Sequence, residues 1–245
     1  SWDSPWDFLA MSDYNSITSL SESPLKEGLI FAGTDDGLIQ ITENGGQSWT
    51  KVEVGSLPGV PATAFVNDIK ADLFDENTVY IALDNHKYGD FAPYLLKSTN
   101  KGRTWSSIRS NLPDRTLMWR IVQDHVKREL MFVATEFGIW FTPDGGNQWI
   151  QFKGGLPVIS FRDLAIQQRE NDLVAASFGR GFYILDDYSF LREVTETQLK
   201  DEAVIYPARK AWWYIERKTL GSEQKASQGD AYFTAENPPF GAVFT

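Results

Sequence analysis

The 245-residue sequence contains no cysteine, 2 histidines and 3 methionines. Without cysteine, the chain has neither a disulfide scaffold nor thiolate chemistry. Long apolar runs are also missing, since the longest, such as residues 130–134, are far shorter than the roughly 20 residues of a membrane-spanning helix. Basic residues are few, and 23 Lys and Arg against 33 Asp and Glu leave a net charge of −10, which repels phosphate backbones and anionic lipid. We therefore expect no transmembrane segment and no nucleic-acid partner.

Sequence motifs of catalytic and cofactor-binding sites are absent as well. The sequence has no glycine-rich phosphate loop, zinc-ligand spacing, EF-hand loop or nucleophile elbow, so we expect no metal and no cofactor. Residues 1–13 lack the basic start and the apolar core of an export signal. We interpret them as an entry segment inside a longer protein, in which any signal lay upstream or has been removed.

One pattern of eight residues occurs three times, at 42–49, 98–105 and 142–149. It consists of Ser or Thr, Asp or Asn two positions later, Gly after two more and Trp after three more. Short apolar segments precede each copy, and a Leu-Pro pair follows each. A fourth set of apolar segments, ending with 172–176 and 181–185, lacks the pattern. The unit is four strands in about 40–55 residues, the size of a β-propeller blade.

The repeat predicts an all-β fold of four antiparallel, four-stranded propeller blades. We place their boundaries at about 14–58, 59–113, 114–157 and 158–190. Residues 191–245 lose the repeat and are interpreted as a linker that folds back on the blades.

The repeated residues have a structural explanation that needs no ligand. The Asp or Asn and the preceding Ser or Thr accept hydrogen bonds from turn amides, Gly permits the positive φ of a tight hairpin, and Trp fills the interface between blades. The residues are Thr42, Asn44, Gly46 and Trp49 in the first copy, Ser98, Asn100, Gly102 and Trp105 in the second, and Thr142, Asp144, Gly146 and Trp149 in the third. We predict that they stabilise the turns.

On these three motifs, the sequence resembles the Asp-box (BNR) repeat proteins, whose blade hairpins occur in sialidases, tandem-propeller xyloglucanases and, more distantly, sortilin-type receptors. The runs 179–187 and 237–243 resemble the large bacterial sialidase-like, or BNR-repeat glycosyl hydrolase-like, proteins. In those relatives the propeller has more than four blades and precedes a β-sandwich. The resemblance implies an incomplete, about four-blade portion of a larger propeller, with the start of a β-sandwich within 191–245. It also implies an exported protein, periplasmic, cell-surface or secreted, whose remaining blades and domains are partners of this segment.

The loops between the second and third strands of each blade should share one face with the loops that join the blades. We expect any ligand site on this loop face, because rigid scaffolds commonly present binding residues on loops. The longest such loop is the insertion 84–93. The ligand-binding candidates on these loops are Asp84, His86, Tyr88, Asp90 and Arg180.

Charged residues also occur on the predicted innermost strands, at Asp68, Arg120, Arg162 and Asp163. They are compatible with a polar channel, in which Arg120 and Arg162 would bind a ligand. They are also compatible with a salt-bridge network around the propeller axis, which we favour. The sequence leaves both interpretations open.

Two functions from different classes fit the sequence. The first is a non-catalytic binding or scaffolding segment of a larger exported bacterial protein, recognising a protein or glycan on the loop face. The second is part of a glycoside hydrolase, sialidase-like or xyloglucanase-like, which needs two carboxylates facing one glycosidic bond. The weak catalytic candidates are Asp35, Asp36 and Glu136. We favour the first function, because the sequence has no positive catalytic signature.

Overall fold

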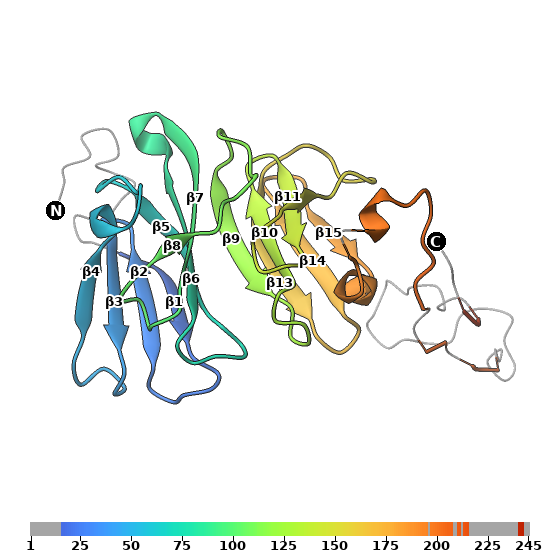
Figure 1. Cartoon of the computed structure of the whole chain (residues 1–245), viewed down its shortest axis with the longest axis horizontal. Helices are drawn as coiled ribbons and strands as arrows, with labels where there is room; N and C mark the ends of the chain where they lie inside the picture. The colour runs from blue at the N-terminus through green and yellow to red at the C-terminus, as the bar shows by residue number, and fades with distance from the viewer. Residues whose placement is uncertain (1–15, 196, 208–209, 212, 216–239, 243–245) are drawn as a thin grey trace, which may run out of the picture. The chain divides into compact units, whose positions relative to one another are not determined.

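The computed structural model describes residues 16–195, 197–207, 210–211, 213–215 and 240–242. Its strands form four antiparallel sheets, in each of which consecutive strands pair as a meander (Figure 1). Blade 1 is β1 (Ile17–Glu22), β2 (Ile30–Thr34), β3 (Leu38–Thr42) and β4 (Thr50–Glu53). Blade 2 is β5 (Phe65–Ala71), β6 (Val79–Asn85), β7 (Asp90–Ser98) and β8 (Ser106–Ser107).

Blade 3 is β9 (Met118–Gln123), β10 (Met131–Thr135), β11 (Gly138–Thr142) and β12 (Ile150–Gln151). Blade 4 has three strands among the described residues, β13 (Phe161–Gln167), β14 (Asp172–Ser177) and β15 (Phe182–Leu185). The short 3-10 helices are η1 (Val54–Ser56), η2 (His86–Tyr88), η3 (Tyr188–Arg192) and η4 (Gln198–Lys200). In the described part of the chain, no helix is long and apolar enough to cross a membrane.

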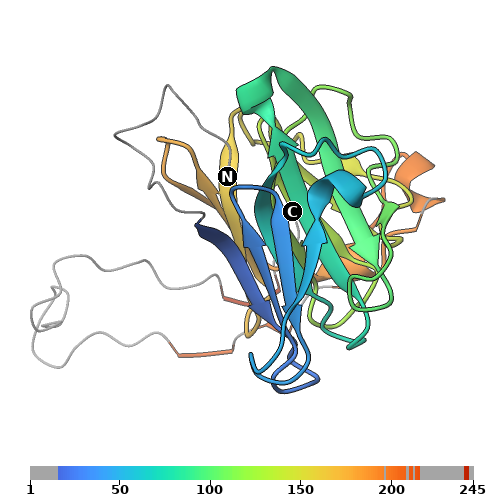
Figure 2. The same cartoon turned by 90° about the vertical axis from the view of Figure 1, so that its left-hand side faces the viewer.

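The hydrophobic core lies between the blades. One cluster joins Phe31 and Ile39 of blade 1 to Ile69 and Ile81 of blade 2, and another joins blades 2 and 3 around Trp149. Figure 2 views blade 1 with the other blades behind it. Strands β6 and β10 are buried along their whole lengths, because neighbouring blades cover both faces of their sheets. Strand β14 alternates between buried and partly exposed residues, because the described residues cover one face of blade 4.

The three repeated motifs fold into turns with one hydrogen-bond pattern. The glycine amide donates to the Ser or Thr hydroxyl, over 2.9 Å in the first turn, 2.8 Å in the second and 2.9 Å in the third. The Asp or Asn side chain accepts from the amide four positions later. These bonds pair turn amides with side chains of the same motif.

The expectation that each motif Trp fills a blade interface is wrong for Trp49. Trp149 is 2% exposed and packs between blades 2 and 3, and Trp105 packs against the cluster between blades 1 and 2. Trp49 is 46% exposed. Among the described residues, no blade precedes blade 1 to cover it.

Blade 4 ends in η3 where the other blades have the motif turn. The Tyr188 amide donates to the Asn171 carbonyl, as the equivalent turn amides of Gly45, Lys101 and Gly145 donate in blades 1 to 3. By this alignment Asp187 stands at the Asp or Asn position, where it accepts from the Ser189 amide, and Arg192 stands at the Trp position. The blade therefore extends beyond residue 190, and the compact unit that contains it ends at Thr195.

The insertion 84–93 is more ordered than the sequence suggested. Strand β6 runs through Asn85 and β7 begins at Asp90, so only η2 and Gly89, with φ 76°, lie between them. Asn85 and Asp90 are paired across the two strands. The expectation of an open loop over this range is therefore wrong. The entry segment 1–13 and most of the expected start of a β-sandwich lie outside the described residues.

Candidate functional site

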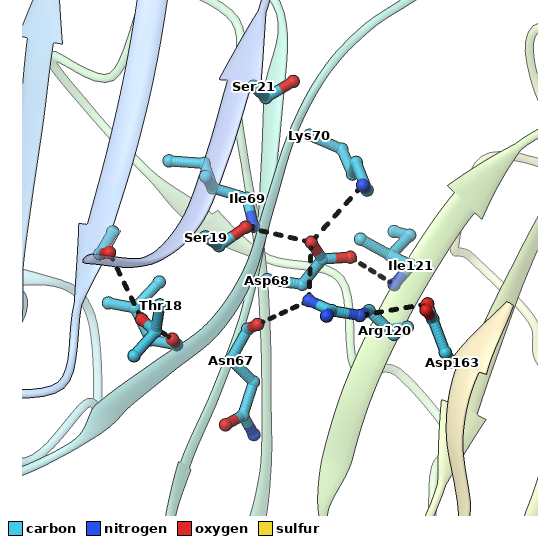
Figure 3. A network of polar contacts seen from close by, with 12 residues as sticks. Thr18, Ser19, Ser21, Asn67, Asp68, Ile69, Lys70, Arg120, Ile121 and Asp163 are labelled. Carbon is cyan, nitrogen blue, oxygen red and sulfur yellow. Dashed lines mark hydrogen bonds and ion pairs between the residues drawn. The ribbon is translucent and has the colours of Figure 1, made fainter. Parts of the chain in front are cut away.

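The innermost strands carry polar side chains at equivalent positions, which we call the polar ladder: Ser19, Asp68, Arg120 and Asp163. Ser19 Oγ donates to Asp68 Oδ1 over 3.1 Å. Arg120 Nη1 donates to the same oxygen over 3.3 Å, and its Nε donates to Asp163 Oδ1 over 3.1 Å (Figure 3). The ladder thus crosses all four blades.

The ladder also receives backbone bonds from the following blade. The Ile69 amide donates to Ser19 Oγ over 2.9 Å, and the Ile121 amide donates to Asp68 Oδ2 over 3.0 Å (Figure 3). Burial raises the pKa of Asp68, and the nearby charges of Lys70 and Arg120 oppose this rise. The geometry of Asp68, Arg120 and Asp163 is that of a salt-bridge network, the second of the two interpretations left open by the sequence.

A β-bulge precedes every ladder residue. The strand register shifts at Thr18, Asn67, Trp119 and Arg162, each of which stands immediately before its ladder residue. Two bulged side chains reach the next blade, because Thr18 Oγ1 donates to the Val66 carbonyl and Asn67 Nδ2 to the Met118 carbonyl. Bulges redirect side chains out of the strand alternation and are common beside binding sites.

Three of the bulged residues line a cavity of about 320 Å³, which we call the loop-face cavity. It lies at the starts of β5, β9 and β13 and at the end of β6 with η2. Its lining residues are Thr63, Phe65, Asn67, Asp84, Asn85, His86, Lys87, Tyr88, Trp119, Arg120 and Arg162. Blades 2, 3 and 4 all contribute to it, so its shape depends on how the blades pack.

A histidine and a buried carboxylate form one wall of the cavity. The Asp84 side chain is 2% exposed, accepts from Asn67 Nδ2 over 2.7 Å and from the His86 amide over 3.1 Å, and is hydrogen-bonded to His86 Nδ1. The His86 ring meets Trp119 edge to face, with centroids 5.9 Å apart. These contacts fix the orientation of the imidazole, and they use the Asp84 oxygens within the fold.

Five of the ligand-binding candidates from the sequence meet in this cavity: Asp84, His86, Tyr88, Arg120 and Arg162. Asp90 and Arg180 are not among its lining residues. Burial of Asp90 is outweighed by hydrogen bonds from the Tyr94 hydroxyl and the Ala92 amide, which lower the pKa of Asp90. Burial and the hydrogen bond to Asp90 raise the pKa of Tyr94 to about 12. Arg180 is exposed in the turn between β14 and β15.

The three weak catalytic candidates are not among the lining residues of the cavity, although Glu136 contacts the lining residues Trp119 and Arg162. Asp35 Oδ1 accepts from the Ser16 amide over 2.9 Å, and Asp36 Oδ1 accepts from the Thr34 hydroxyl over 2.5 Å. Glu136 Oε2 accepts from Trp119 Nε1 and from Ser160 Oγ, each over 3.1 Å. Each carboxylate therefore has a local structural partner.

Sequence reasoning did not name the remaining lining residues individually, although two of them, Asn85 and Lys87, lie in the insertion 84–93 that it singled out. The others are Thr63, Phe65, Asn67 and Trp119. A signal for two of them was present, because Asn67 and Trp119 stand directly before ladder residues, as Arg162 does. Aligning the inner strands of blades 2 to 4 on their charged ladder residues would have grouped Asn67, Trp119 and Arg162. Thr63 and Phe65 carry no such signal, since a Thr and a Phe at a strand start are ordinary structural residues.

No family model and no curated protein matches the sequence. Solved structures do match the described architecture. A GH74 enzyme from Niastella koreensis is 15% identical with a TM-score of 0.55, over 71% of this chain and 29% of the enzyme. The β-propeller domain of Swd1 from Myceliophteria thermophila is 13% identical with a TM-score of 0.51, over 69% of this chain and 51% of that domain. The chain is an incomplete β-propeller.

A third similar structure is YCF48 bound to D1 peptide, with 19% identity and a TM-score of 0.52. The match covers 71% of this chain and 52% of YCF48. The chain therefore spans about half of two of these structures and less than a third of the GH74 enzyme. Likenesses at this identity establish the propeller fold, which hosts enzymes and non-enzymatic proteins alike.

Proposed function

We propose that this chain is a non-catalytic binding or scaffolding segment of a β-propeller in a larger exported bacterial protein, and that it recognises a protein or glycan at the loop-face cavity. The observation that carries this proposal is the composition of the cavity. Side chains of Lys87, Arg120 and Arg162 line it together with aromatic rings, and Asp84 is the single carboxylate among its described lining residues. This is the composition of a recognition site rather than of a paired-acid catalytic centre.

The position of the cavity supports the same function. Its bulged residues Asn67, Trp119 and Arg162 come from three successive inner strands, whose relative placement is held by the polar ladder. A site built on packed strands is more rigid than one on loops alone, and rigidity lowers the entropic cost of binding. Export and membership of the Asp-box proteins are the parts of the proposal that rest on the sequence resemblance.

The glycoside hydrolase alternative has weaker support. Glycosidases place two carboxylates about 5–10 Å apart across the bond that they cleave. Asp84, the described carboxylate of the cavity, already bonds Asn67 and His86. The neighbours that are GH74 enzymes share the fold with this chain at identities too low to transfer an activity.

Binding to printed peptide and glycan arrays tests the proposed function. The wild-type chain and a Tyr88→Ala variant are applied to the same arrays. Tyr88 lines the cavity and is 48% exposed, so its truncation should leave the fold intact. We expect the wild type to bind a reproducible set of ligands and the variant to lose at least about tenfold in affinity for them.

Phe74→Ala is the matched control, because Phe74 is 39% exposed in the turn between β5 and β6, at the opposite end of those strands. Equal losses in both variants would argue against the cavity as the site. A separate assay incubates the chain with xyloglucan oligosaccharides and sialyllactose. Release of sugar that is abolished by Asp84→Asn would overturn the non-catalytic proposal in favour of the hydrolase.

A further inference from the structure

Arg162 lies between two aromatic rings at the edge of the loop-face cavity. Its Cζ is 3.6 Å from the centroid of the Trp119 ring and 5.0 Å from the centroid of the Phe178 ring. A guanidinium this close to an indole is stacked on the ring face. Stacking fixes the plane of the guanidinium and leaves the N–H groups at its edge available for hydrogen bonds. The side chain is thus ordered by contacts that do not consume its donors.

The existing partners of Arg162 leave most of this hydrogen-bonding capacity unused. Within the described part of the chain its one ion pair is with Glu136, whose Oε2 is 3.9 Å from Nη2, too far for a hydrogen bond. That oxygen already accepts from Trp119 and Ser160. Arg120 is different, because its Nε and Nη1 donate to Asp163, Asp68 and the Asn67 carbonyl. Arg120 holds the blades together, whereas Arg162 is presented to the cavity.

Two aromatic rings of the cavity, those of Trp119 and Phe65, already have cations over them. Trp119 is 7% exposed and carries Arg162 on its ring, and Lys87 Nζ lies over the Phe65 ring at 5.6 Å. Cations therefore lie where a neutral sugar would stack on these two rings. The same cations make the cavity locally positive in a chain of net charge −10.

We infer that the loop-face cavity binds a carboxylate group of a protein ligand, an acidic side chain or a chain terminus, through the guanidinium edge of Arg162. This inference rests on the proposed function and specifies its ligand. A stacked guanidinium is preorganised for two parallel N–H to oxygen bonds with a carboxylate, which are charge-assisted and directional. The ammonium group of Lys87 adds electrostatic attraction for the carboxylate without fixing its orientation.

The test uses an array of decapeptides in matched pairs that differ only by Glu or Gln at one position. We expect the wild-type chain to bind the Glu member of a subset of pairs at least about tenfold more tightly than the Gln member. Arg162→Gln should abolish this preference. Arg169→Gln removes the same charge at a side chain that is 82% exposed in the turn between β13 and β14, and it should leave the preference unchanged.

The outcomes separate this inference from the proposed function. Peptide binding that depends on Tyr88 but does not distinguish Glu from Gln would overturn the inference and leave the proposed function standing. Binding of glucuronate-containing glycans, lost in Arg162→Gln, with no peptide binding would also overturn it, because the ligand would then be an acidic glycan. An absence of binding on both peptide and glycan arrays would overturn the two proposals together.

Discussion

Trp149 and Trp49 stand at the same position of the same motif, in turns with the same hydrogen bonds, and yet 2% of one is exposed and 46% of the other. Trp149 packs on blade 2, where its Nε1 donates to the Ile108 carbonyl over 2.8 Å. Trp49 has no described blade before it. The comparison separates two roles of one motif. The side-chain hydrogen bonds form within the turn itself, whereas the Trp side chain is buried only where a preceding blade packs against it.

The motif glycines show the same division. A Cβ on Gly102 would meet Ile41 Cδ1 of blade 1 at 2.4 Å, and a Cβ on Gly146 would meet Ile108 Cβ at 3.0 Å. A Cβ on Gly46 would come no closer than 3.7 Å, to Trp49 of its own turn. All three have positive φ, so the backbone requirement for glycine is common and the close approach is specific to covered blades.

The largest effect should come from truncating the two tryptophans. We expect Trp149→Ala to lower the free energy of unfolding by about 3–5 kcal/mol, because it leaves a cavity between blades and an unpaired Ile108 carbonyl. Trp49→Ala should cost less than about 1 kcal/mol, because its side chain is half exposed. Urea unfolding of both variants measures the difference. Equal losses would show that the Trp acts within its own turn.

Arg192 extends the comparison to blade 4, where it replaces the Trp and pairs with Asp124 of blade 3 over 2.8 Å. Burial of Asp124 is outweighed by hydrogen bonds from Arg192 and Tyr188, which lower its pKa. A carboxylate with a lowered folded-state pKa contributes stability above its unfolded pKa, about 4, and this contribution is lost as the pH falls through the folded-state pKa.

We therefore expect Arg192→Met to lower the free energy of unfolding by about 3 kcal/mol at neutral pH, because it leaves a buried charge unpaired. The difference in unfolding free energy between wild type and variant should narrow as the pH falls below about 4, the unfolded-state value, towards the lowered folded-state pKa of Asp124. Urea unfolding as a function of pH measures both effects. Arg169→Met, on an exposed side chain, is the control. If the difference in unfolding free energy between wild type and Arg192→Met did not change with pH, the ion pair with Asp124 would not be its cause.

The smallest effect should be the difference between two glycine substitutions. Gly46→Ala and Gly102→Ala both place a side chain at positive φ, which is strained in each case. Gly102→Ala must also displace Ile41, and we expect it to cost about 1–3 kcal/mol more than Gly46→Ala. Thermal unfolding of the two variants provides the comparison. The same melting temperature for both variants would mean that the Ile41 side chain moves aside with little loss of stability.

The sequence predicted the fold well, because propeller strands follow a local pattern that repeats. The apolar segments that precede the second and third motif copies include β6 and β10, and the fold class of an incomplete propeller of about four blades is confirmed. The end of blade 4 was not predicted, since Asp187 alone keeps its motif identity there. Leu185, Ser189 and Arg192 replace the Thr, Gly and Trp, and only the backbone bond from Tyr188 to Asn171 reveals the equivalence.

The candidate site could be predicted from the sequence less well than the fold. Asp84, His86 and Tyr88 were grouped because they are neighbours in the chain. Their proximity to Arg162 depends on the packing of three blades, and the exclusion of Asp90 depends on a strand pair that extends further than the pattern suggested. The partnership of Arg162 with Phe178 follows from a turn in another part of blade 4. Such contacts are set by tertiary packing, which a single sequence does not report.

The polar ladder has a consequence for the order of the blades. Its side chains run from a hydroxyl through a carboxylate and a guanidinium to a second carboxylate, each matched to the blade on either side. Exchanging blades 3 and 4 would bring Asp163 against Asp68 and leave Arg120 at the outer edge. The four repeats have similar backbones, but their ladder side chains differ. Each blade therefore pairs best with its own neighbours, and this favours one order of the blades in the array.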